Sequence, residues 1–101
     1  MDTRTKALDE LIEELQNMLP KLQGQYHVQS LEVFGSYLHG AQKIDSDLDL
    51  LVTFDQNPSL FKFMELENYL GDHLGVKVDL VMKDSLKPAI GKHILAEAQP
   101  I

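Results

Sequence analysis

Two aspartates, Asp47 and Asp49, lie two residues apart in the segment DLDLLVTF. In a β-strand, residues i and i+2 point to the same side, with Cα atoms about 6.5–7 Å apart. Two carboxylates on one face repel each other unless water or a cation separates them. Because Mg²⁺ is usually held by one or two carboxylates together with substrate phosphates, the pair predicts a divalent-cation site. A solvated strand end is the alternative interpretation.

A third carboxylate, Asp79, interrupts the apolar segment VKVDLVM. A lone acid on the polar face of a strand is commonly just exposed to solvent. If its strand lies beside the strand of Asp47 and Asp49, three carboxylates converge on one patch of the sheet. Such a patch is suited to one or two Mg²⁺ ions, with one carboxylate near an attacking hydroxyl.

Gly35 and Ser36 follow a predicted strand and are separated from Asp47 by ten residues. Glycine allows close approach of the backbone to a ligand, the N–H groups at a helix start attract phosphate, and a serine hydroxyl adds a donor. The same dipeptide is also an ordinary turn, so its weight comes from its place before the aspartate pair. This segment is a candidate phosphate-binding loop.

An EF-hand calcium loop is a competing interpretation of the segment DSDLD, which starts at Asp45. Such a loop needs Gly at its sixth position and Glu at its twelfth. Leu50 and Gln56 occupy these positions, and the residues from Leu48 onward favour a strand. The sequence therefore argues against an EF-hand.

Three short strands are predicted to position these residues. Residues 28–34 alternate loosely and contain β-branched side chains, whereas residues 47–54 give the strongest pattern because every second residue from Leu48 is apolar. Residues 76–82 form the third strand, with Asp79 on the face opposite its apolar residues. The order and direction of the strands do not follow from this pattern.

The first predicted helix covers residues 8–22, where apolar residues recur at steps of three and four. Proline lacks an N–H group and clashes with the preceding turn, so Pro20 is expected to kink or end this helix near Leu19. Gly24 supports a stop shortly afterwards.

Two further helices are predicted at residues 60–74, with Ser59 as N-cap and Gly75 after the last turn, and at residues 88–98. Residues 37–44 are expected to hold one helical turn and then a loop. This order of elements favours a small sheet covered by helices, in the α/β or α+β class.

The composition bounds the function. The chain has 101 residues, enough for one domain, and it has no cysteine, which excludes disulfides, cysteine-based metal sites and a thiol nucleophile. With 9 Lys+Arg against 16 Asp+Glu, the net charge is −7, so the chain is poorly suited to grip nucleic acid. Apolar runs are too short to span a bilayer, and a soluble cytoplasmic protein without a membrane role is expected.

Together, three segments resemble the minimal nucleotidyltransferases of the polymerase-beta-like nucleotidyltransferase superfamily. They are GSYLHG from Gly35, SDLDLLV from Ser46 and VDLV from Val78. A Gly-Ser pair, then Asp-x-Asp in a strand, then a later strand aspartate is a fairly specific combination. The resemblance covers most of the chain, so it implies one minimal nucleotidyltransferase domain over residues 1–101, with a short mixed sheet flanked by helices.

The resemblance also implies an activity, namely transfer of AMP from ATP to a hydroxyl with release of pyrophosphate. It implies that Asp47, Asp49 and Asp79 bind Mg²⁺ (one or two ions), that Asp79 is placed to take the proton of the acceptor, and that Gly35 and Ser36 hold the β- and γ-phosphates. Members of this size are often encoded with a small all-helical HEPN-type protein. They act there as antitoxins, and some adenylylate a tyrosine of the toxin.

One position departs from the family pattern. An arginine often precedes the second glycine of the Gly-Ser loop, whereas His39 precedes Gly40 here. Arginine provides a permanent charge and a fork for phosphate, while histidine is mostly neutral at pH 7. The alternative function is therefore a catalytically weak or inactive antitoxin that neutralises its partner by forming a complex. An antibiotic-modifying enzyme is a third possibility, but it would need a second domain.

Overall fold

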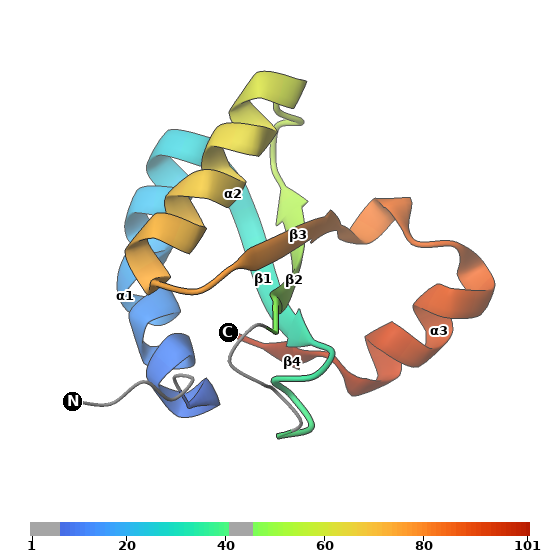
Figure 1. The fold of residues 1–101 in the computed structure, drawn as a ribbon. Coiled ribbons are helices and arrows are strands. Elements are labelled where there is room, and N and C mark those ends of the chain that lie inside the picture. Colours follow the sequence, from blue (N-terminus) through green and yellow to red (C-terminus); the bar gives the residue numbers. More distant parts are fainter. Residues whose placement is uncertain (1–6, 41–45) are drawn as a thin grey trace.

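The computed structural model describes residues 7–40 and 46–101. The helices α1 and α2 lie on one side of a sheet and α3 lies on the other (Figure 1). The elements, in chain order, are α1 (Leu8–Tyr26), β1 (Val28–Phe34), β2 (Leu48–Phe54), α2 (Leu60–Leu74), β3 (Val78–Met82), the short 3₁₀ helix η1 (Lys83–Ser85), α3 (Pro88–Glu97) and β4 (Gln99–Pro100). Among the described residues, no helix is both long enough and apolar enough to cross a membrane.

The sheet is mixed, with the strand order β3-β2-β1-β4. The strand β1 runs antiparallel to both β2 and β4, whereas β3 runs parallel to β2. A parallel pair needs a long crossover, and α2 supplies it between β2 and β3. The expected short mixed sheet flanked by helices is thus confirmed, and the strand order supplies what the sequence pattern left open.

The core lies between the sheet and the two helices α1 and α2. Its fully buried leucines come from one stripe of each helix and from alternate positions of β2, as the periodicities of helix and strand require. They are Leu11, Leu15 and Leu22 of α1, Leu66, Leu70 and Leu74 of α2, and Leu48 and Leu50 of β2. Leu51 points to the opposite face and is also buried, so β2 is covered on both sides.

Most predicted element boundaries agree with the structure. The strand at residues 28–34 and the helix at residues 60–74 are observed as predicted. The side chain of Ser59 accepts the N–H of Lys62 at 3.2 Å, and Gly75 ends α2 with φ +73°. The other two strands begin one or two residues later than expected, and η1 and β4 were not predicted.

The prediction that Pro20 ends the first helix near Leu19 is wrong, because α1 continues through Pro20 to Tyr26. Pro20 removes the hydrogen-bond donor for the carbonyl of Gln16, four residues earlier. Both residues are exposed, so water can take the place of the lost donor. The helix ends instead at His27, whose φ of +59° is left-handed and whose N–H donates to the carbonyl of Leu22.

Replacing Pro20 with alanine is expected to raise the free energy of unfolding by about 2 kcal/mol. Alanine restores the missing donor to Gln16 and removes the ring clash. For a domain of this size, the melting temperature should rise by on the order of 10 °C. The exposed change Asn17→Ala in the same helix serves as control and should give less than about 0.7 kcal/mol. An unchanged or lower melting temperature for Pro20→Ala would contradict this account.

Candidate active site

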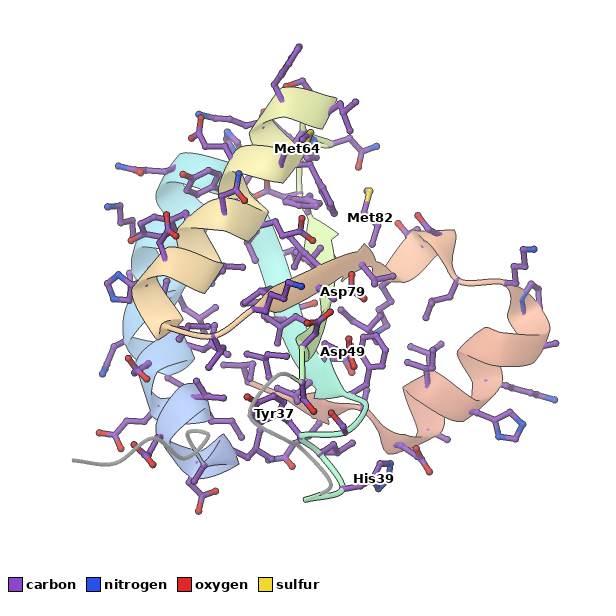
Figure 2. The ribbon with its side chains drawn as sticks, viewed as in Figure 1. Tyr37, His39, Asp49, Met64, Asp79 and Met82 are labelled. Carbon is purple, nitrogen blue, oxygen red and sulfur yellow. The ribbon has the colours of Figure 1, made fainter. Side chains whose placement is uncertain are left out.

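Asp49 and Asp79 lie directly opposite each other on the parallel strands β2 and β3. Leu48, Leu50 and Leu80 point into the core, and strand alternation sends the two aspartates to the other face. Figure 2 shows the two side chains close together there. The strand of Asp79 is therefore the neighbour of the Asp47–Asp49 strand, which was the condition for the predicted carboxylate patch.

The environment of Asp49 disfavours its negative charge. Its pKa is raised from 3.8 to about 6, first by burial, then by the negative charges of Asp79 and Asp47, and also by a hydrogen bond with Asp79. Each of these causes is what a bound cation would offset, because a positive ion favours the ionised carboxylate. The charge of the patch thus makes it a candidate cation site.

Gly35 brings the backbone of the predicted phosphate loop against the carboxylate of Asp49. The residue has φ +82°, a left-handed conformation that glycine adopts without steric cost. A Cβ atom built on Gly35 would overlap Oδ2 of Asp49 and would lie 3.1 Å from its Cγ. The position therefore requires glycine twice, once for its backbone angle and once for the space that Asp49 occupies.

Residues 36–40 form tight turns and not the helical turn that was expected. The N–H of Leu38 donates to the carbonyl of Gly35 at 3.1 Å, and the N–H of Gly40 donates to the carbonyl of Tyr37 at 3.3 Å. Of the two predicted phosphate-loop residues, Gly35 lies against Asp49, and Ser36 follows it in the chain and is partly buried. The rest of the predicted loop, residues 41–44, lies outside the described residues.

Two side-chain contacts that anchor this loop were not predicted from the sequence. Tyr37 is buried in the core and so anchors the loop there, and its pKa is raised first by burial and then by the charge of Asp47. His39 Nε2 lies 3.1 Å from Glu97 Oε2 at the end of α3, and both side chains are exposed. An apolar residue after Gly-Ser was the available signal for the first, whereas the second depends on the fold.

The three aspartates do not form a ready-made ligand cluster. In the described part of the chain, no group of three or more His, Cys, Asp or Glu side chains is gathered so as to hold a metal ion. Asp49 and Asp79 are brought together, while Asp47 is exposed just before β2 begins. Paired carboxylates with an open side fit Mg²⁺, which takes its remaining ligands from water and phosphate.

Replacing Gly35 with alanine is expected to abolish function while leaving a folded protein. The added methyl group must displace either the loop or Asp49. Gly40→Ala is the matched control, because Gly40 also has a positive φ, +67°, but nothing lies within 4 Å of its Cβ position. Both variants should lose about 1 kcal/mol of stability, and the nucleotidyl transfer that the resemblance implies should fail in Gly35→Ala alone. Equal activity of the two variants would contradict this role.

The pKa of Asp49 predicts a pH dependence of stability for the metal-free protein. The pKa of Asp49 is about 6 in the folded state, above its ordinary value of 3.8. Between these pH values the folded state therefore binds more protons than the unfolded state, and rising pH lowers the free energy of unfolding. The variant Asp49→Asn does not titrate. We therefore expect the lead of Asp49→Asn over the wild type in melting temperature, measured in EDTA, to grow from about pH 4 to about pH 6 and to stay constant above that. A lead that shrinks with rising pH would refute this assignment.

Comparison with known proteins identifies the family. The model of the nucleotidyltransferase domain matches residues 8–101. Among curated proteins, the protein adenylyltransferase MntA of Thermococcus cleftensis is 49% identical over 90 residues, covering 85% of this chain and 91% of that protein.

Solved structures share the fold. A chain provisionally named a minimal nucleotidyltransferase matches with a TM-score of 0.76 at 33% identity, covering 100% of this chain and 97% of that one. A toxin–antitoxin structure with AMP-PNP matches with a TM-score of 0.69 at 26% identity. The match covers 84% of this chain and 70% of that one. A Shewanella oneidensis complex of a tri-AMPylated HEPN toxin with an MNT antitoxin matches at 0.58 and 22%, covering 91% and 66%. The chain therefore belongs to the nucleotidyltransferase domain family and, within it, to the minimal, MntA-like protein adenylyltransferases.

Proposed function

We propose that this chain transfers AMP from ATP to a hydroxyl of a small all-helical HEPN-type protein, with Mg²⁺ bound at the aspartate patch, and that it acts as the antitoxin of that partner. The observation that carries the proposal is the direct pairing of Asp49 with Asp79, with the backbone of Gly35 against Asp49. The candidate phosphate loop thereby adjoins the candidate cation site, an arrangement that nucleotide chemistry requires.

In the proposed reaction, the acceptor oxygen attacks the α-phosphorus of ATP. The bond from this phosphorus to the oxygen that bridges to the β-phosphate breaks, and pyrophosphate leaves. Asp47, Asp49 and Asp79 would hold the magnesium, which when bound neutralises phosphate charge. Asp79 is exposed, so it is also placed to take the proton of the acceptor hydroxyl.

Gly35 and Ser36 would hold the β- and γ-phosphates in this proposal. The glycine lets a phosphate approach the backbone, and the serine hydroxyl donates a hydrogen bond. His39, where the family often has arginine, is held by Glu97. Since the loop lies against Asp49, the phosphates and the metal-binding carboxylates would meet on one side of the sheet.

The proposed partner and donor follow from the relatives. One solved toxin–antitoxin structure contains AMP-PNP, an analogue of ATP, and another pairs an MNT antitoxin with an AMPylated HEPN toxin. The net charge of −7 disfavours direct binding of nucleic acid. An ATP donor also fits the expected cytoplasmic location. We propose that one domain over residues 1–101 carries this activity.

An inactive antitoxin that binds its partner without chemistry is the second candidate. Exposed apolar side chains at the start of α2 favour it, because Leu60 is 71% and Phe61 is 84% exposed. The exposed His39 in place of an arginine favours it as well. This candidate predicts that complex formation alone neutralises the partner.

Replacing Asp47 or Asp49 with asparagine is expected to lower label transfer from α-labelled ATP by on the order of 10²–10³-fold, because the metal charge is lost from the transition state. The assay combines this protein, Mg²⁺, the labelled nucleotide and the protein that co-purifies with it. Asp55→Asn is the control, since Asp55 follows β2, pairs with His27 and lies outside the site.

Each outcome of this assay separates the two candidates. Label on the partner that disappears in both site variants, but not in the control, supports nucleotidyl transfer. Label that persists in both site variants would refute the assigned aspartates. A stable complex that carries no label with the wild type, across several nucleotides and metals, would favour the binding antitoxin.

A further inference from the structure

A carboxylate from α2 holds the free edge of β3 directly beside Asp79. The backbone N–H of Leu80 donates to Oε2 of Glu67 at 2.9 Å, in a partly buried contact. In the described sheet, β3 is an edge strand that pairs with β2 alone. The amide of Leu80 therefore finds its acceptor on a helix and not on a strand.

This contact opposes a repulsion that the site itself creates. Asp49 and Asp79 occupy one register position on β2 and β3, so the two carboxylates repel each other when both are ionised. The five residues of β3 are held by the ladder with β2 on one side. By accepting the Leu80 amide, the side chain of Glu67 holds β3 at its other edge as well.

We propose that Glu67 is a positioning residue for nucleotidyl transfer, because its hold on the Leu80 amide fixes the adjacent Asp79 opposite Asp49. This inference rests on the proposed function of the aspartate patch. The hydrogen bond of Glu67 goes to the backbone of Leu80 and not to either aspartate, so Glu67 acts through the backbone of β3. A small displacement of β3 would move a carboxylate that must meet the metal and the acceptor at the same time.

The test compares Glu67→Ala, Glu67→Gln and Glu67→Asp. The side-chain oxygen of glutamine can still accept from Leu80, alanine has no acceptor, and the aspartate carboxylate is one methylene shorter. A groove of about 450 Å³, lined by Glu67, Lys77 and Val78 among others, lies beside the contact. We expect water from this groove to fill the space that the carboxylate leaves, so the variants should remain folded.

Two rates are measured at a temperature well below the melting temperature of each variant. Each rate is divided by the concentration of folded protein. The first is label transfer from α-labelled ATP to the co-purifying protein. The second is hydrogen exchange of the Leu80 amide, which needs neither metal nor nucleotide. Transfer should fall about 10-fold in Glu67→Ala and Glu67→Asp and stay within about two-fold in Glu67→Gln. Exchange of the Leu80 amide should be about 10-fold faster in the first two variants.

The controls distinguish failure of this inference from failure of the proposed function. Glu65→Ala, on the same helix but bonded to Tyr26 and Lys62, should leave transfer and Leu80 exchange unchanged. Asp79→Asn should abolish transfer. If Asp79→Asn is inactive and Glu67→Ala transfers at the wild-type rate, the positioning role is overturned and the proposed site stands. If Asp79→Asn retains full activity, both are overturned.

Discussion

The repulsion between Asp49 and Asp79 is the constraint around which the structure is built. Two neighbouring strands carry carboxylates at one register position, which costs free energy when both are ionised. The fold meets this cost in two ways. The strand of Asp49 is central and covered on both faces, while the edge strand of Asp79 has its far side held by Glu67 of α2. The helix that connects the two strands thus also restrains them.

The same carboxylate determines the shape of the preceding loop. Gly35 turns at the end of β1 with a left-handed backbone, and any larger residue would collide with Asp49. Because Phe34 pairs with Asp49 across the antiparallel strands, the loop necessarily starts at the row of the sheet that carries the aspartates. Tyr37 then anchors the loop in the core. The antiparallel register of β1 and β2 is therefore sufficient to place the loop beside the carboxylates.

The elements that sequence predicts well are those whose side-chain period is local. Alternation along β2 and the capped helix α2 follow from neighbouring residues, and both are observed. The path of α1 through Pro20 was not predictable, since it depends on the tertiary packing of the stripe around Leu22, which outweighs one lost hydrogen bond. The strand order likewise depends on contacts between distant residues. From the sequence, the pairing of Asp49 with Asp79 could be predicted only on the condition that their strands are neighbours. The strand order of the fold meets this condition.

The balance of charge explains why a cation matters for the proposed reaction. The lysine that follows β3, Lys83, is paired with Glu32 at 2.6 Å, and His39 is paired with Glu97. Both side chains contact carboxylates of the protein, and the whole chain has a net charge of −7. A triphosphate brings further negative charge to a patch that already raises the pKa of Asp49. Bound metal is then the natural source of the missing positive charge, and it would at the same time remove the repulsion that the sheet otherwise has to contain.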